Sequence, residues 1–517
     1  MATVPDISLD GWIAQRAQRC PLRPALTFEG SAYSYADLAE QIARLAGLLA
    51  AGGIKRGDRV GYLGFNHPMF LVTMFAASRL GAIFVPVNFR LTGPEVGFIV
   101  NDAGIHTLLA GEEHQGLVDN IAASLCCQRY LWVDGARGDG RDAAQGMAAA
   151  TPLAHEPLAT ADDVALILYT SGTTGQPKGA MLSHGNLWWN NVNALLTMDY
   201  REDDVTLNSA PLFHIGGLNV TTLITLMKGG HVVLHRQFDP SAFLDDVPRY
   251  RVTTHFAVPA MLLFVSQHAR FNEADLSSIR MLVVGGAPVP EALLRLYNER
   301  GIAVQQGYGM TETAPMISFL TPEWSLAKLG SAGRPPLLSE VRLIDGAGSI
   351  VAEPRGRGEV CTRGPNVMAG YWNRPEATRE TIDENGWLRT GDVGYFDEDG
   401  FLYICDRVKD MVISGGENVY PAEVENVLYA HPSIAEVAVI GTSDDVWGEA
   451  IAAIAVLRPG QSLTLEELNA FAERQLARYK LPKHLQIVGA LPRGTTGKVL
   501  KYLLRAQFAQ ALEGATR

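Results

Sequence analysis

Short apolar runs alternate with longer segments of helical period along most of the chain. Residues 165–170 (ALILYT) precede 184–196 (HGNLWWNNVNALL), and 279–286 (IRMLVVGG) precede 290–301 (PEALLRLYNERG). A short apolar run between turn residues is typical of a buried strand, and apolar residues three and four positions apart indicate an amphipathic helix. The alternation therefore predicts βα units, with sheets covered by helices.

Two later stretches follow other patterns. Residues 341–363 have short apolar runs separated by glycine turns, which predicts a small antiparallel barrel or sheet. In the last hundred or so residues we expect strands at 401–405, 411–414, 435–441, 450–457 and 484–488, and a final helix. Helices should begin at Pro421, a residue suited to the first helical position, and at Thr464, which forms a capping box with Glu467.

The charged segment 406–410 (DRVKD) is the boundary that we predict between these regions, although the same charges would suit a solvated turn. The chain is expected to be an α/β multi-domain protein. Residues 1–406 form a large N-terminal domain of βα subdomains plus a small β-barrel, and residues 407–517 form a small α+β domain. A chain of 517 residues also exceeds the roughly 250 to 300 at which single cores usually split.

Composition narrows the functional classes. A net charge of −12 disfavours non-specific attraction to nucleic acid or anionic lipid, so a polyanionic ligand would need a local site. The five cysteines show no disulfide or zinc framework, which favours a reducing compartment. No secretory signal and no apolar run near the ~18 residues of a membrane span are evident. We expect a cytoplasmic protein and leave a homo-oligomer open.

Residues 169–184 (YTSGTTGQPKGAMLSH) suit a polyphosphate. Glycines at 172, 175 and 179 free the backbone to aim several N–H groups at one place, Lys178 adds a positive charge, and four hydroxyl residues add donors. Those hydroxyl residues are Thr170, Ser171, Thr173 and Thr174. The stretch is not a P-loop, because Pro177 stands where that motif needs glycine. Taken alone, it could equally be a flexible surface loop of small residues.

The order S-G-T-T-G-x-P-K-G after a strand resembles the phosphate loop of the adenylate-forming superfamily, which includes acyl-CoA synthetases, peptide-synthetase adenylation domains and luciferases. Further matches follow in family order over essentially the whole chain. They are PLFHIGG (211–217), VVGGAPVP (283–290), QQGYGMTET (305–313), a long match over 385–425, and LPRGTTGKVLK (491–501). Six co-linear motifs identify the chain as a member of this superfamily.

The resemblance implies a site for ATP, Mg²⁺ and coenzyme A. Tyr308 would stack on adenine, Asp392 would accept hydrogen bonds from the ribose hydroxyls, and Arg407 would contact ribose or phosphate. Glu312 would be the magnesium ligand, since its carboxylate is a hard oxygen donor. The further cofactor-binding residues implied are Thr170, Ser171, Gly172, Thr173, Thr174, Gly175, Lys178, Gly286, Ala287, Pro288, Gln306, Gly307, Gly309, Met310 and Thr311.

The catalytic groups implied are Lys498, His214, Glu312 and Thr174. Lys498 would contact both the carboxylate and the α-phosphate and stabilise charge in the adenylation transition state. His214 would lie beside the acyl carboxylate, with a core histidine as the structural alternative. Two positions differ from the commonest family pattern, with Asp406 for glycine and Arg389 for histidine.

The small domain is expected to be mobile by the same resemblance. Lys409 would be the hinge, absorbing the rotation that exchanges the adenylation and thioesterification faces. Ser414, Gly415 and Gly416 would let the pantetheine arm of CoA pass close to the backbone.

The expected substrate is a hydrophobic monocarboxylic acid, because the pocket segments 213–219, 283–288 and 308–316 are apolar or small and contain no arginine for a second carboxylate. A medium- to long-chain fatty acid is our first expectation. Alternatives are a feruloyl- or cinnamoyl-type acid, a carrier-loading adenylation enzyme, and a non-catalytic acyl- or nucleotide-binding relative. We expect neither of the last two, because the sequence contains no appended carrier domain and because Lys178, Glu312, Asp392 and Lys498 are all present.

Overall fold

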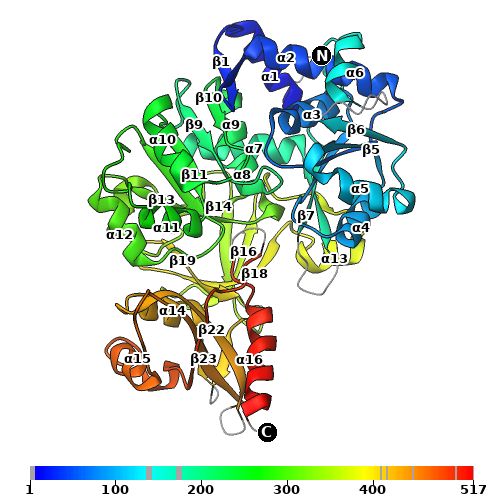
Figure 1. The fold of residues 1–517 in the computed structure, drawn as a ribbon. Coiled ribbons are helices and arrows are strands. Elements are labelled where there is room, and N and C mark those ends of the chain that lie inside the picture. Colours follow the sequence, from blue (N-terminus) through cyan, green and yellow to red (C-terminus); the bar gives the residue numbers. More distant parts are fainter. Residues whose placement is uncertain are drawn as a thin grey trace.

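A computed structural model of the chain describes residues 6–134, 142–170, 177–407, 410–414, 417–444, 448–494 and 498–515. The large part, up to Arg407, contains three sheets, and a smaller part follows it (Figure 1). The eight-stranded sheet has the order β14-β13-β12-β11-β9-β10-β1-β2. Its strands are β1 (Pro24–Phe28), β2 (Ser31–Ser34), β9 (Val205–Asn208), β10 (His231–Leu234), β11 (Thr254–Ala257), β12 (Met281–Gly285), β13 (Val304–Gly309) and β14 (Met316–Phe319).

The seven-stranded sheet has the order β17-β8-β7-β4-β3-β5-β6. Its strands are β3 (Arg59–Leu63), β4 (Ile83–Val87), β5 (Ile105–Gly111), β6 (Arg129–Val133), β7 (Val164–Thr170), β8 (Lys178–Ser183) and β17 (Gly370–Tyr371). In the eight-stranded sheet the two edge pairings, β13 with β14 and β1 with β2, are antiparallel and the others are parallel. In the seven-stranded sheet β8 pairs antiparallel with both β7 and β17, and the other pairings are parallel. The predicted βα units are therefore present.

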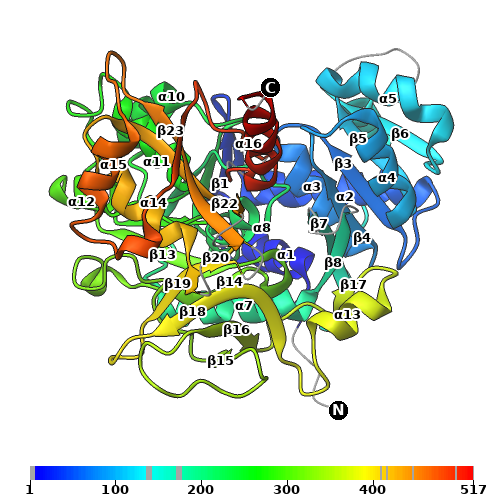
Figure 2. The same cartoon turned by 90° about the horizontal axis from the view of Figure 1, so that it is seen from below.

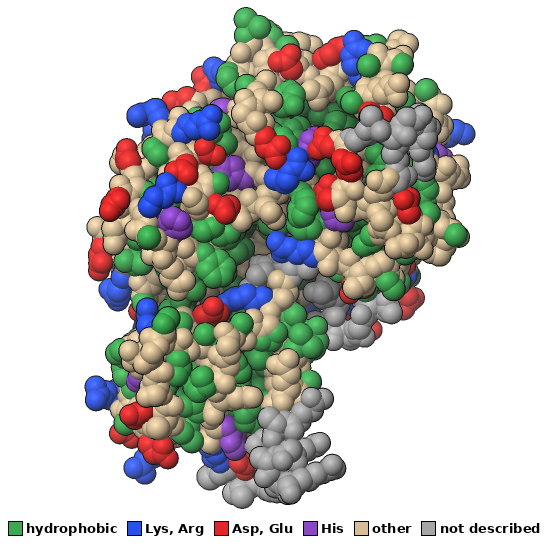
Figure 3. Space-filling view, in the orientation of Figure 1, with side chains coloured by type: hydrophobic (Ala, Val, Ile, Leu, Met, Phe, Trp, Pro, Cys, Tyr) green, Lys and Arg blue, Asp and Glu red, His purple; other side chains and the backbone are tan. Residues whose placement is uncertain are grey.

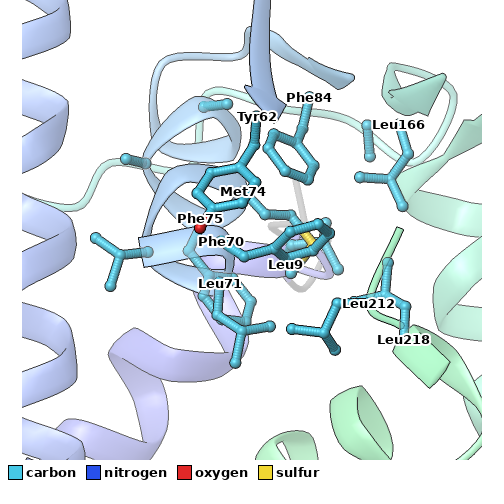
Figure 4. Packing of buried hydrophobic residues seen from close by; sticks show 14 of the residues in the cluster. Leu9, Tyr62, Phe70, Leu71, Met74, Phe75, Phe84, Leu166, Leu212 and Leu218 are labelled. Carbon is cyan, nitrogen blue, oxygen red and sulfur yellow. The ribbon is translucent and has the colours of Figure 1, made fainter. Parts of the chain in front are cut away.

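Helices cover these sheets and fill the space between them. They are α1 (Leu9–Arg19), α2 (Tyr35–Ala51), α3 (Pro68–Arg79), α4 (Gly93–Ala103), α5 (Gln115–Ile121), α6 (Ala143–Ala149), α7 (His184–Thr197), α8 (Ile215–Asn219), α9 (Thr222–Lys228), α10 (Pro240–Tyr250), α11 (Pro259–Gln267), α12 (Glu291–Glu299) and α13 (Pro375–Thr381). Every residue of α3 is buried. Its Phe70 and Phe75 lie in one apolar cluster with Leu26 of the larger sheet and Phe84 and Leu166 of the smaller sheet (Figure 4 shows most of these).

The glycine-rich stretch leads into a strand that the sequence pattern did not predict. Residues Lys178–Ser183 form β8, which pairs antiparallel with β7. Helix α7 begins at His184, the first residue of the helical stretch predicted over 184–196, and the Ser183 side chain caps it.

The third sheet is antiparallel, with four strands in the order β15-β16-β18-β19. They are β15 (Glu340–Ile344), β16 (Gly358–Arg363), β18 (Leu388–Phe396) and β19 (Leu402–Arg407). This is the small antiparallel unit predicted for residues 341–363. The strand expected at 401–405 was grouped with the C-terminal region, but as β19 it pairs with β18 and completes this sheet instead.

The small part has one sheet, β21-β20-β23-β22, with β24 beside β23. Its strands are β20 (Val412–Ser414), β21 (Glu417–Val419), β22 (Ile434–Asp444), β23 (Gly448–Leu457) and β24 (His484–Ile487), and its helices are α14 (Pro421–Tyr429), α15 (Leu465–Ala472) and α16 (Lys501–Ala515). Pro421 occupies the first helical turn and the Thr464–Glu467 capping box is formed, as predicted. Helices α14 and α15 lie on one face of the sheet and α16 on the other (Figures 1 and 2).

One face of the molecule carries charges of both signs. On the face in Figure 3, lysine and arginine side chains are interspersed with aspartate and glutamate. Within the described residues no helix has the length and apolar character needed to cross a membrane. The domain boundary at 406/407 remains a prediction, and it falls one residue before the end of β19, the last strand of the large part.

Candidate active site

The phosphate-loop motif connects β7 with β8. Thr170, the last residue of β7, pairs with Lys178, the first residue of β8, and the Thr170 hydroxyl lies 3.4 Å from the Lys178 carbonyl oxygen. The Tyr169 hydroxyl donates to Asp102 at 2.7 Å, and Asp102 also pairs with Arg374. The base of the hairpin is therefore anchored. The predicted ligands Ser171, Gly172, Thr173, Thr174 and Gly175 lie outside the described residues.

The second motif forms the end of β13 and the short helix Thr311–Thr313 after it. Gln306 is buried and donates to the Ser331 carbonyl at 3.1 Å, while Gly307, Met310 and Thr311 are half-buried. Gly309 must be glycine, because a methyl group there would lie 1.6 Å from the Pro315 carbonyl oxygen. This close packing fixes the backbone on which Tyr308 and Glu312 are carried.

Glu312 is buried, with 5% of its surface exposed. Its Oε1 accepts a hydrogen bond of 2.8 Å from the Tyr371 hydroxyl. Burial raises the pKa of Glu312, while the Tyr371 hydrogen bond and the positive charges of Arg407 and Lys178 act in the opposite direction. The Lys178 ammonium lies 5.2 Å from the centre of the Tyr371 ring. The predicted metal ligand and the predicted phosphate ligand thus share one neighbour, Tyr371, to which sequence reasoning assigned no role.

Asp392 links two other predicted residues. The Tyr308 hydroxyl donates to its Oδ2 at 2.7 Å, and Arg407 Nε lies 3.3 Å from its Oδ1. Arg407 lies beside Asp392 because the two residues are opposite each other in the paired strands β19 and β18. Burial, with the nearby Asp392 charge, raises the pKa of Tyr308 well above its ordinary value, so its hydroxyl stays a donor. The structure brings these three residues together, and their nucleotide contacts remain predictions.

The remaining residues of the large part lie at loop and helix starts. Gly286, with φ +85°, adopts a backbone conformation that favours glycine, and Ala287 and Pro288 follow it near the surface. His214 is half-buried, precedes the first residue of α8 without a side-chain capping hydrogen bond, and its ring centre lies 4.2 Å from that of Phe213.

Two predicted pocket segments meet around the Phe256 side chain, and Met316 of the third packs against the same apolar cluster. Methyl groups added at Gly216 and Gly285 would lie 2.9 Å and 3.7 Å from the Phe256 ring, and one at Gly307 would lie 3.5 Å from Phe319. Phe256 and Phe319 belong to the same buried apolar cluster. Sequence reasoning missed Phe256, because within the short strand THFA it is indistinguishable from any core phenylalanine.

The small part carries the predicted catalytic lysine. Lys498 is exposed, its carbonyl oxygen accepts the Gly494 N–H at 2.7 Å, and helix α16 begins three residues later. Ser414 is buried at the end of β20, opposite Gly448. The predicted hinge Lys409 and the predicted CoA-binding Gly415 and Gly416 lie outside the described residues.

The donor set can be tested for magnesium. The described residues contain no group of three or more His, Cys, Asp or Glu side chains that could form a metal cage. Mg²⁺ usually binds proteins through one or two carboxylates together with substrate phosphates and waters. One buried carboxylate, Glu312, near the base of the loop predicted to hold phosphates therefore suits Mg²⁺ delivered with ATP.

Comparison with known proteins gives consistent matches along the chain. The family model for AMP-binding enzymes matches residues 13–372, and that for their C-terminal domain matches residues 423–498. A feruloyl-CoA synthase of Amycolatopsis sp is 46% identical over 97% of this chain and 99% of its own. The long-chain-fatty-acid–CoA ligase FadD13 of Mycobacterium tuberculosis (strain CDC 1551 / Oshkosh) is 39% identical over 96% of this chain and 98% of its own.

A solved structure has the same fold. The o-succinylbenzoate CoA synthetase of Bacillus subtilis, in complex with its acyl-adenylate intermediate, superposes with a TM-score of 0.85 and 37% identity over 96% of this chain and 97% of its own. The family models and the identity over nearly full length agree with the motifs. The chain belongs to the AMP-binding enzyme family and stands among its AMP-forming acid–CoA ligases.

Proposed function

We propose that this protein activates a hydrophobic monocarboxylic acid in two steps. The carboxylate attacks the α-phosphorus of ATP, giving an acyl-adenylate and pyrophosphate, and the CoA thiolate then attacks the acyl carbon and releases AMP. The observation that carries the proposal is the pair of contacts around the nucleotide motifs, Tyr371 between Glu312 and Lys178, and Asp392 between Tyr308 and Arg407. Neither step needs a covalent enzyme nucleophile, so catalysis would come from positioning of the substrates and electrostatic stabilisation of the transition state.

The residues then divide the tasks. Thr170, Lys178 and the loop 171–175 would hold the β- and γ-phosphates, and Tyr308 and Asp392 would hold adenosine. Glu312 would hold Mg²⁺, which neutralises phosphate charge when bound. Lys498 would stabilise the transition state of the first step. The hinge at Lys409 would then let Ser414, Gly415 and Gly416 admit CoA for the second.

For the acyl group we favour an aryl acid of the phenylpropenoic type. Phe256 is 4% exposed and packs tightly against Gly216, so an acyl chain passing between the pocket glycines would have to displace a buried ring. A pocket that ends at an aromatic ring suits a flat substrate of limited length. The 46% identity to a feruloyl-CoA synthase supports the same choice.

A medium- to long-chain fatty acid is the second candidate. The apolar cluster behind Phe256 contains flexible side chains, including Met198 and Met281, that could rearrange around an alkyl chain. The 39% identity to FadD13 supports it. For the reaction's location we propose a reducing compartment such as the cytoplasm, in keeping with the five free cysteines.

The test is pyrophosphate release measured with acids from acetate to long-chain fatty acids, with cinnamate and ferulate included. We expect the highest kcat/KM with an aryl acid, and AMP release that depends on CoA. An optimum on long-chain acids would replace the first candidate by the second. Absence of pyrophosphate release with every acid would contradict the proposed function itself.

A further inference from the structure

Tyr371 is placed beside the nucleotide motifs by strand pairing. It is the last residue of β17, which pairs antiparallel with β8, so that Tyr371 is opposite Ala180. The Ala369 N–H donates to the Met181 carbonyl, and the Trp372 N–H donates to the Gly179 carbonyl. Because β8 begins at Lys178, near the end of the phosphate-loop motif, this pairing places Tyr371 beside the strand that follows the loop.

The segment around Tyr371 contacts both the backbone and the side chain of Glu312. The Met368 N–H donates to the Glu312 backbone carbonyl at 2.8 Å, and the Tyr371 hydroxyl donates to its carboxylate, also at 2.8 Å. Tyr371 is 8% exposed and Glu312 5%. A hydrogen bond to a buried carboxylate fixes its direction, since few other donors can replace the one that is lost.

The ring of the same tyrosine faces a cation. Lys178 Nζ lies 5.2 Å from the ring centre, within the distance at which an ammonium is attracted to an aromatic face. The hydroxyl and the ring therefore make separate contacts, with a carboxylate and with an ammonium. Of these two partners, Glu312 is expected to bind the magnesium and Lys178 the phosphates of MgATP.

We propose that Tyr371 is a positioning residue that holds the Glu312 carboxylate and the Lys178 ammonium in fixed relation, so that magnesium and phosphate are bound as one unit. This inference rests on the proposed function, in which Glu312 takes the metal and Lys178 the phosphates. Partners that orient metal ligands typically change metal affinity about 10- to 100-fold when they are removed.

The test compares ATP binding with Mg²⁺ and with excess EDTA, by calorimetry on the full-length protein. In Tyr371→Phe the ring stays over Lys178 but the hydroxyl is lost. We expect the gain in ATP affinity caused by Mg²⁺ to shrink about tenfold, while affinity in EDTA stays within about twofold of the wild type. In Tyr371→Leu, which removes the ring as well, affinity should fall under both conditions.

Tyr297→Phe is the matched control. Tyr297 is a buried tyrosine whose hydroxyl donates to the Leu262 carbonyl at 2.8 Å, and among the described residues it makes no hydrogen bond to an ionised group. Its variant should keep the Mg²⁺-dependent gain. Should Tyr371→Leu fail to fold, Tyr371→Phe still decides, since it keeps the ring and its packing.

Two results would overturn the inference. One is an unchanged Mg²⁺-dependent gain in Tyr371→Phe, and the other is an equal fall in affinity with and without Mg²⁺, which a purely structural tyrosine would produce. Failure of the proposed function looks different, because the wild-type protein itself would then release no pyrophosphate with any acid. In that case the binding comparison still reports on Tyr371.

Discussion

In the large part, Glu312 and Asp392 are buried and each is fixed by a tyrosine hydroxyl, whereas in the small part the predicted catalytic Lys498 is exposed, just before helix α16. The predicted nucleotide residues are thus arranged by packing within the large part. In the proposed mechanism, Lys498 would reach them only through the orientation of the small part. Variants of the large part should therefore change nucleotide binding in both half-reactions, and variants of Lys498 should change one.

Lys498→Ala should show the largest effect. Removing a charged group that acts on the transition state typically costs about 10²- to 10³-fold in rate. We expect acid-dependent ATP–pyrophosphate exchange to fall by at least this factor, while attack of CoA on supplied acyl-adenylate is largely kept. Normal exchange in the variant would remove Lys498 from its proposed role. Lys483→Ala serves as the control, because Lys483 belongs to the same part of the chain and immediately precedes β24.

Asp392→Asn tests the large part and should weaken its binding of the nucleotide. A hydrogen bond to a charged group contributes roughly 1.5 to 3 kcal/mol, so the KM for ATP should rise about 10- to 100-fold. Because the adenylate keeps its ribose, reaction of supplied acyl-adenylate with CoA should suffer too. Steady-state kinetics of both half-reactions provide the measurement. A defect confined to adenylation would contradict the view that the large part serves both steps.

A third prediction concerns the stability of the large part. His155 lies between Asp10 and Asp6, at 2.5 and 2.8 Å, and Asp10 also pairs with the buried Arg79. The hydrogen bonds that the His155 ring donates to the Asp10 and Asp6 carboxylates raise the pKa of His155 to about 9. Its folded pKa exceeds the unfolded value of about 6.5, so the stabilisation is complete below pH 6.5 and is lost as pH rises through 9.

The expected loss is on the order of 2 kcal/mol between pH 6.5 and pH 9. Thermal unfolding followed by circular dichroism should show a midpoint that falls over this window in the wild type and much less in His155→Gln. His431→Gln, in the small part, where the ring packs against Phe471, is the control and should keep the wild-type dependence. Equal pH dependence in all three proteins would rule out the His155 cluster as its source.

Local patterns were enough for the elements with strong periodicity and caps. The βα units, the antiparallel unit after 341, and the helices at Pro421 and Thr464 were all predicted from spacing and capping residues. Strand β8 was not predicted and β19 was grouped with the wrong region, and the two misses share one cause. Both are short strands whose partners, β7 with β17 and β18, are set by tertiary pairing that no local pattern reveals.

The site divides in a similar way. Family motifs placed Lys178, Glu312, Tyr308, Asp392 and Arg407 in the sequence, and the structure brings them together. Tyr371 and Phe256 were missed because their importance lies in what they touch. Tyr371 is 59 residues from Glu312 in sequence and reaches it through a two-residue strand at a sheet edge. Such contacts depend on the whole fold, so a single sequence gives no signal for them.

The last prediction tests the junction between the two parts. The Asp406 carboxylate accepts a hydrogen bond of 2.9 Å from the Ala422 N–H, in the first turn of α14. The Lys501 ammonium pairs with Glu425 at 2.8 Å, and its positive charge also favours the ionised form of Asp406. Asp406 precedes the predicted hinge and Ala422 follows it. These contacts therefore stabilise one orientation of the small part relative to the large part.

Asp406→Asn should weaken that orientation by about one hydrogen bond, so the half-reaction that uses it should slow roughly two- to tenfold relative to the other. ATP affinity should stay unchanged, because the nucleotide residues are fixed within the large part. Asp410→Asn is the matched control, since Asp410 pairs with Arg505 at 2.8 Å on the far side of the hinge and the pair would move as one body. If both variants alter the two half-reactions to the same degree, the contact at Asp406 does not select the orientation, and other contacts between the parts, such as Arg357 with Glu423, hold the small part.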